Sequence, residues 1–303
     1  MKKPALLLLI ALFCLQTRAA DRDGINRGIF EKIASAVSDK TALPVPDLTV
    51  QIALSMLDTP YVGGTLEGEK EELRIFLDKT DCILFVETCI CMALTFKGLA
   101  ITQGDTPQTK APSYELFCDN IRNMRYRGGA VNGYASRLHY TSEWILQAEA
   151  NGILKEYTKE IGRVRDQHFS FMTSHKDLYP ALKDSVEQTG LIKEAENRLE
   201  EAGPYFFVPN SRLHELSRQH ADSDRQSNFE SGAIRSGDII FIVSGADGLD
   251  ISHVAIAYEL SDGMHFIHAS SKAGKVIIEP RTLADYATRG VRLASLHSIL
   301  FSK

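Results

Sequence analysis

The sequence predicts an α+β fold in which one helix packs on an antiparallel sheet, and three observations support this. Apolar side chains in residues 82–94 recur three, four, seven and eight positions apart, which gives one buried helix face. Residues 238–297 contain five short β-rich runs separated by Gly, Asp and Ser. The segment between them, about 98–230, is polar and rich in helix signals. We therefore expect a core of about 47–97 and 231–303 with a helical insertion.

The first residues differ from the rest of this 303-residue chain, which is 44% hydrophobic and 24% charged. Two lysines precede an apolar run at 5–15, and small residues follow where a signal peptidase would cleave. We interpret residues 1–19 as a signal peptide and 20–303 as a single catalytic domain. The apolar run is shorter than the roughly 20 residues that span a bilayer, so no stable membrane insertion is expected. Lipid attachment at Cys14 is disfavoured because Phe13 stands where a small residue is needed.

Charge and cysteine usage narrow the function further. Cleavage removes three of the 34 basic residues and leaves 39 acidic ones, so the mature net charge is about −8 and nucleic acid is not an expected partner. Four cysteines remain, an even number that permits disulfides in an oxidising compartment. However, Cys89 lies about 10 Å along the helix from Cys82, and Cys89 and Cys91 point to different sides. The same geometry disfavours zinc, so no metal or other cofactor is expected.

The elements before the cysteine helix are expected to lead the chain towards it. Residues 20–46 are polar and end in two prolines, which predicts a leader and a rigid turn. A helix follows from Asp47, as its cap, to Leu57. The segment Pro60–Gly64 reads PYVGG, and its paired glycines allow a close approach by another part of the chain, although a simple loop is the alternative.

The cysteine helix should begin directly at Cys82. Asp81 is a good N-cap, because its carboxylate can accept hydrogen bonds from the unpaired N–H groups of the first turn. A thiol at the first helical position lies at the positive helix end, which favours the nucleophilic thiolate. The alternative is a free cysteine that behaves as a small buried hydrophobe.

The insertion concentrates aromatic, basic and hydroxyl side chains around glycine turns, at residues 126–129 and 134–144. Such a mixture suits a sugar or peptide subsite, although aromatic residues at helical spacing are more often part of the core. The candidate substrate-binding residues are Arg127, Tyr134, Arg137, His139, Tyr140 and Trp144.

Two histidines lie on neighbouring strands of the predicted antiparallel meander, whose runs are 238–243, 253–259, 264–268, 275–279 and 291–297. The hairpin signal Asp262-Gly263 places Ala255 opposite, or nearly opposite, His268. Since side chains alternate with period two, His253 and His268 share one face. The small Ala255 and Ala257 on that face should let the cysteine helix pack closely. A Cys, a His that takes its proton and a third polar group form the nucleophile, base and orienter of acyl transfer.

The order of the motifs LDTPYVGG, TDCILFVE, SGDIIFI, SHVAIAYE and FIHASS resembles the NlpC-type papain-like cell-wall hydrolases. The insertion with RYRGG and RLHYTSEW is similar to the amidase-like family of Bacteroidetes-type secreted proteins. The resemblance implies a papain-like core with Cys82 as nucleophile, His253 as general base and acid, and His268 as orienter. It also implies that the Tyr61 hydroxyl helps to stabilise the oxyanion. The sequence DCIL departs from the commoner pattern, in which a Ser-Gly pair follows the cysteine.

The resemblance further implies N-acetylmuramoyl-L-alanine amidase activity, with a preference for peptidoglycan fragments that end in 1,6-anhydro-muramic acid. Such an enzyme would act as a periplasmic monomer on muropeptides. Two alternatives remain: an endopeptidase that cuts between γ-D-glutamate and the diamino acid, and a non-catalytic peptidoglycan-binding module.

Overall fold

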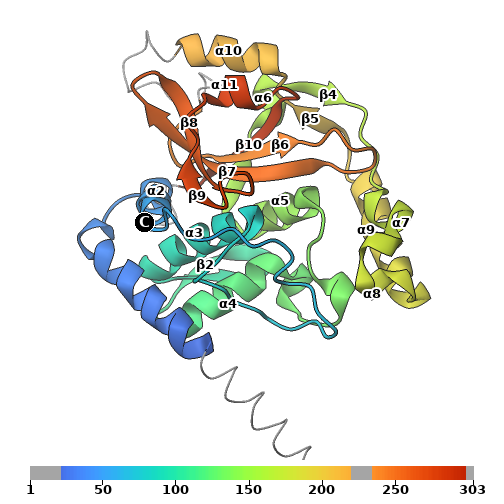
Figure 1. Cartoon of the computed structure of the whole chain (residues 1–303), viewed down its shortest axis with the longest axis horizontal. Coiled ribbons are helices and arrows are strands. Elements are labelled where there is room, and N and C mark those ends of the chain that lie inside the picture. The colour runs from blue at the N-terminus through green and yellow to red at the C-terminus, as the bar shows by residue number, and fades with distance from the viewer. Residues whose placement is uncertain (1–21, 220–233, 298–303) are drawn as a thin grey trace, which may run out of the picture.

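The computed structural model describes residues 22–219 and 234–297, so the expected signal peptide lies outside the described residues. One large sheet has helices on both faces (Figure 1). On one side lie α2 (Val45–Ser55), α3 (Cys82–Phe96) and α5 (Thr141–Ala150), and on the other lie α10 (Asn210–Gln219) and α11 (Leu283–Tyr286). This mixture of helices and strands agrees with the predicted α+β class. No helix in the described ranges is long and apolar enough to cross a membrane.

The main sheet has six antiparallel strands in the order β3-β10-β6-β7-β8-β9. Their bounds are β3 Leu154–Glu156, β6 Ile239–Val243, β7 Ile251–Leu260, β8 Gly263–Ser270, β9 Lys275–Ile278 and β10 Val291–Leu296. All five predicted runs are therefore strands. Only β6 to β9 form a meander, because β10 returns to pair with β6 at the other side of the sheet. The edge strand β3 comes from the expected insertion.

The residues of β7 and β8 pair in the register that the hairpin signal predicted. Their ladder runs from Leu260 opposite Gly263 to Ile256 opposite Ile267, which is the register that sets Ala255 and His268 at the next position. The ladder does not extend beyond Ile256, so the two strands separate close to the histidines.

The predicted packing of the cysteine helix, however, is wrong. Helix α3 (Cys82–Phe96) packs against the face that carries Val254, Ile256 and Ile267. Ala255 and Ala257 face the opposite core, beneath α11 (Leu283–Tyr286). Both faces of β7 are apolar, so period-two alternation alone does not reveal which of them a helix covers.

The segment before α3 contains more structure than predicted. Residues 22–36 form a helix that buries Phe30 and Ile33, where a polar leader was expected. Its apolar residues are few, but they are spaced for one helix face. Helix α2 (Val45–Ser55) begins two residues before Asp47 and has no side-chain cap.

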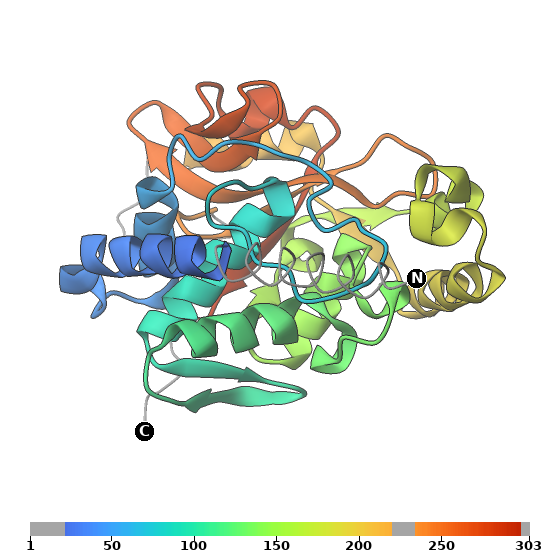
Figure 2. The same cartoon turned by 60° about the horizontal axis from the view of Figure 1, so that its bottom comes forward.

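The expected insertion is partly built into the core. Helices α4 (Tyr114–Arg125) and α5 (Thr141–Ala150) contribute to the same hydrophobic cluster as α3, and β3 extends the main sheet. A separate cluster holds α7 to α9 together as a lobe, which Figures 1 and 2 show at one side of the molecule. The remaining elements are η1 Ser38–Lys40, β1 Leu99–Thr102, β2 Asp105–Thr109, η2 Arg127–Gly129, η3 Tyr134–Ser136, α6 Thr158–Ile161, β4 Arg163–Arg165, α7 Phe171–Ser174, η4 Lys176–Leu178, α8 Pro180–Lys183, α9 Val186–Glu201, β5 Tyr205–Phe207 and α10 Asn210–Gln219.

Candidate active site

Cys82 is the first residue of α3, as predicted. The Leu84 N–H donates a hydrogen bond of 3.0 Å to Asp81 Oδ1, which closes the first turn and confirms Asp81 as the N-cap. Cys82 is partly exposed, whereas Cys89 and Cys91 are fully buried, and all cysteines of the described ranges are free thiols. Cys82 is therefore the helix thiol that a substrate can reach.

The protonation of this thiol differs from the expectation. Burial raises the pKa of Cys82 to about 11, and the Asp81 carboxylate adds to the rise. Hydrogen bonds from the Val254 N–H and from N–H groups of the first helical turn act in the opposite direction, but they do not cancel it. The partial positive charge at the N-terminus of α3 is thus too small to stabilise a thiolate beside a carboxylate in a mostly buried site. The resting group is a neutral thiol, and it needs a base.

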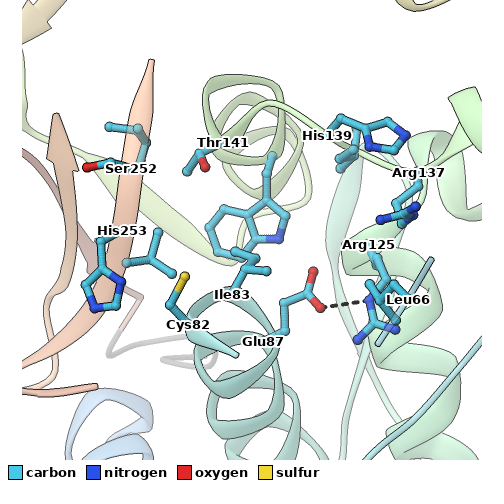
Figure 3. Close-up of a pocket in the computed structure, with 14 residues that line it drawn as sticks. Leu66, Cys82, Ile83, Glu87, Arg125, Arg137, His139, Thr141, Ser252 and His253 are labelled. Carbon is cyan, nitrogen blue, oxygen red and sulfur yellow. Dashed lines mark hydrogen bonds and ion pairs between the residues drawn. The ribbon is translucent and has the colours of Figure 1, made fainter. Parts of the chain in front are cut away.

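His253 and His268 bridge the gap where β7 and β8 separate. His253 Nε2 lies 2.7 Å from His268 Nδ1, and the two rings are nearly perpendicular, at 87°. Because Nε2 is engaged, Nδ1 of His253 is the nitrogen that remains to exchange a proton with a thiol. Burial lowers the pKa of each histidine to about 4, so both rings are neutral near pH 7. Figure 3 shows His253 beside Cys82 at one end of a pocket.

Glu279 continues this chain of polar groups and was missed in the sequence. His268 Nε2 lies 3.4 Å from Glu279 Oε2, and Arg281 Nε donates to Glu279 Oε1 at 2.7 Å. The signal was present in the strand pattern: Ile277 pairs with His268, and Glu279 follows two residues later on the same face of the neighbouring chain segment.

Two tyrosines flank the thiol. The Tyr61 N–H donates to the Gly274 carbonyl at 2.8 Å, which holds the PYVGG segment beside the loop between β8 and β9. Burial, then the charges of Cys82 and Asp81, raises the pKa of the Tyr61 hydroxyl. Tyr286 on α11, which the sequence did not single out, stacks edge-on against His268 with ring centres 5.9 Å apart.

A pocket of about 200 Å³ extends from Cys82 and His253 into the region of α4 and α5. Three of the six candidate substrate-binding residues line it: Arg137, His139 and Trp144. Figure 3 shows Arg137 and His139 at the end opposite Cys82. The sequence-predicted nucleophile and part of the predicted subsite therefore share one cavity.

The far wall of this pocket is built from buried charges. Arg125 donates to Glu87 at 2.8 Å, and both side chains are nearly inaccessible, at 4% and 3% exposure. Arg137 makes ion pairs with Glu67 at 2.9 Å and with Glu71 at 3.2 Å. Paired carboxylates and guanidinium groups in one wall offer acceptors and donors for the hydroxyl and amide groups of a polar ligand.

The other three candidates do not line the pocket. Arg127 forms a two-pronged ion pair with Glu143, at 2.7 and 2.9 Å. The Tyr140 hydroxyl donates to buried Glu196 at 2.8 Å, in the core of the α7–α9 lobe. Tyr134 stacks against His139 with ring centres 4.4 Å apart. These three side chains make their contacts outside the pocket, so we do not expect them to contact substrate.

Within the described part of the chain, no group of three or more His, Cys, Asp or Glu side chains is arranged to hold a metal ion. The arrangement of Cys82, His253, His268 and Glu279 instead offers a nucleophile, a base adjacent to it and a series of groups that orient the base.

Solved structures with this architecture are known. An N-acetylmuramoyl-L-alanine amidase from Bacteroides uniformis ATCC 8492 aligns with a TM-score of 0.69 and 29% identity, covering 84% of this chain and 99% of that one. A candidate xylanase from Bacteroides fragilis aligns with a TM-score of 0.65 and 32% identity, covering 80% and 98%. A protein from Legionella pneumophila, 20% identical with a TM-score of 0.61 and coverage of 91% and 96%, shares the fold.

Among curated proteins there is no significant match. The model of the family described as AmiA-like, N-acetylmuramoyl-L-alanine amidase-like, matches residues 51–291, which include α3 and most of the main sheet. The chain therefore belongs to the N-acetylmuramoyl-L-alanine amidase-like family and is a hydrolase of that class.

Proposed function

We propose that this protein is a cysteine-dependent N-acetylmuramoyl-L-alanine amidase with a papain-like, NlpC-type core. It would hydrolyse the amide between the lactyl group of muramic acid and L-alanine in peptidoglycan fragments. The observation that carries the proposal is the placement of Cys82 and His253 at one end of a pocket, with His268 2.7 Å behind His253. The first residues resemble a signal peptide, which supports a location in the periplasm.

The reaction begins with transfer of the Cys82 thiol proton to Nδ1 of His253. The sulfur attacks the lactyl carbonyl carbon, and a tetrahedral oxyanion forms. In this proposal the Cys82 N–H and the Tyr61 hydroxyl donate hydrogen bonds that stabilise this oxyanion. His253 then returns the proton to the nitrogen of L-alanine, the C–N bond breaks, and a thioester to the sugar acid remains.

The second half restores the enzyme. His253 removes a proton from water, and the resulting hydroxide attacks the thioester carbonyl. The carbon–sulfur bond breaks, the thiolate takes the proton from His253, and the muramic acid leaves as a free acid. One water is consumed, and one amide becomes one acid and one amine.

The size of the pocket supports soluble fragments as substrates. A cavity of about 200 Å³ is smaller than the roughly 300–1,000 Å³ of sites for drug-sized ligands, and it suits about one sugar ring. A 1,6-anhydro-muramic terminus has no sugar attached at C1, so it would fit where a glycan continuing from C1 would clash. Binding energy from this sugar would then align the amide with Cys82.

Mass spectrometry of products from defined muropeptides tests the proposal. The mature chain and its Cys82→Ser variant are each given soluble anhydro-disaccharide tetrapeptide and, separately, intact sacculi. We expect wild-type protein to release free peptide that begins with L-alanine, faster from the soluble fragment, and the variant to release none.

Other outcomes would select other functions. Products cut after D-glutamate with the sugar still attached would identify an endopeptidase. Faster release from sacculi would mean an amidase with an open cleft. Binding of the fragment without any cleavage by wild-type protein would identify a binding module.

A further inference from the structure

We propose that Glu279 is a positioning residue, which keeps the proton of His268 on Nε2 and thereby keeps Nδ1 of His253 free to accept the proton of Cys82. This inference rests on the proposed role of His253 as the base. It adds a fourth group to the predicted series of nucleophile, base and orienter.

His253 Nε2 and His268 Nδ1 are in direct contact, at 2.7 Å. A neutral imidazole has one N–H and one bare nitrogen, so a contact between two neutral rings needs one donor and one acceptor. If Nδ1 of His253 is to accept a proton, its own proton must be on Nε2, directed at His268. Nδ1 of His268 must then be bare, and the proton of His268 must be on Nε2. That nitrogen is the one that faces Glu279, at 3.4 Å.

A carboxylate is the group that enforces this arrangement, because an ionised carboxylate accepts hydrogen bonds and donates none. Glu279 is only 5% exposed. Burial alone would raise its pKa, but hydrogen bonds from Arg281 outweigh burial and hold the pKa of Glu279 below its ordinary value. Glu279 therefore stays ionised at neutral pH, and His268 has only an acceptor to face.

The position of Glu279 is fixed by its backbone. Its N–H donates to the Phe266 carbonyl at 2.9 Å, and its own carbonyl lies 2.9 Å from His265 Nδ1. The ionisable groups around the pair of Glu279 and His268 come from several elements: His253 of β7, His265 of β8, Tyr286 of α11 and Arg281.

A purely structural role is the competing explanation, in which Glu279 only anchors Arg281 beside α11. Arg281 is 53% exposed and stacks over the Tyr286 ring at 4.4 Å, so a link between Glu279 and α11 does exist. The two roles differ in one respect: a structural role depends on the Arg281 ion pair, whereas the positioning role depends on Glu279 being an acceptor that cannot donate.

Glu279→Gln separates the roles. The side chain of this variant would be an amide, which can donate to His268 Nε2 and would thereby move the proton of His268 to Nδ1. The proton of His253 would then also move to its Nδ1, and this nitrogen could no longer accept the proton of Cys82. We expect kcat to fall about 100-fold with little change in KM, by analogy with other residues that set a histidine tautomer. Glu279→Asp keeps an acceptor and should recover at least about a tenth of the wild-type kcat.

Asp285→Asn is the matched control. Asp285 lies near Arg281 and accepts a hydrogen bond from Thr282, and it contacts neither histidine of the pair. The variant makes the same change from carboxylate to amide on a neighbouring segment, and its kcat should match that of wild-type protein.

Two readouts do not depend on substrate identity. Imidazole ¹⁵N shifts report which ring nitrogen carries the proton: we expect Nε2 of His253 in wild-type protein and Nδ1 in Glu279→Gln. The rate of Cys82 alkylation by iodoacetamide at pH 7 should fall at least tenfold in the same variant and not in Asp285→Asn. If wild-type protein cleaves no amide but both readouts depend on Glu279, the proposed function fails and the positioning role stands. Unchanged tautomers in Glu279→Gln, or equal losses in Glu279→Asp, would overturn the positioning role.

Discussion

Removal of the base gives the sharpest test of the mechanism, because the pKa of Cys82 sets the size of the effect. At pH 7 a thiol with a pKa of about 11 is ionised in about one molecule in ten thousand. In the proposed mechanism, wild-type protein avoids this limit by passing the proton of Cys82 to His253 during attack. His253→Ala has no such acceptor, so we expect kcat to fall about 10³- to 10⁴-fold, within the range of general-base effects.

The pH profile of wild-type kcat/KM follows from the same groups. In the proposed mechanism, the reactive form is the neutral Cys82 thiol with neutral His253. The pKa of His253 is lowered from 6.5 to about 4, so the neutral ring is lost only as the pH falls through about 4. The thiol is lost as the pH rises through about 11. The two apparent values belong to the coupled pair, and activity should be nearly level between about pH 5 and 10.

The assay is hydrolysis of anhydro-disaccharide tetrapeptide from pH 4 to 10, with circular dichroism to verify that His253→Ala is folded. A folded variant that keeps more than a few per cent of wild-type kcat would refute His253 as the base. An alkaline limb well below pH 10 in wild-type protein would show instead that the resting pair is a thiolate and an imidazolium, because the imidazolium would lose its proton there.

Three further predictions follow from the site. His268→Ala should keep residual activity, about 10- to 100-fold below wild-type, because an orienter is less essential than the base; rates equal to wild-type would remove it from the mechanism. Cys82 should react with iodoacetamide faster than Cys118, whose pKa burial also raises to about 11, and peptide mapping should show this advantage disappear when the base is removed. Arg137→Lys should raise KM about tenfold, since a lysine cannot keep the separate contacts to Glu67 and Glu71 while it faces the pocket, and Arg127→Lys outside the pocket should leave KM unchanged; equal KM values would exclude Arg137 from substrate binding.

Local patterns in the sequence were sufficient to place Cys82, the proposed nucleophile, at the start of α3. Asp81 caps α3 by accepting a hydrogen bond from the Leu84 N–H, so the position of Cys82 follows from residues adjacent in the chain. The strands of residues 239–296 and the shared face of His253 and His268 also follow from local signals, because period-two alternation and hairpin parity depend on short stretches.

Packing between distant segments decided the rest. Both faces of β7 are apolar, so only the tertiary structure shows that α3 covers Val254 and not Ala255. The neutral state of the Cys82 thiol depends on burial by those distant segments, which outweighs the helix end that the sequence makes visible.

Packing between distant segments also decided which of the predicted substrate-binding residues line the pocket, and it explains why Glu279 and Tyr286 were not predicted. Composition grouped six aromatic and basic residues of the insertion, but the folding of the α7–α9 lobe directs Tyr140 into a core and leaves Arg137 in the pocket. Glu279 and Tyr286 reach the histidines from segments after β8, through a sheet pairing and a short helix. A single sequence indicates which side chains can do chemistry; which of them meet depends on long-range contacts, whose free energy is shared over the whole core and not carried by any short pattern.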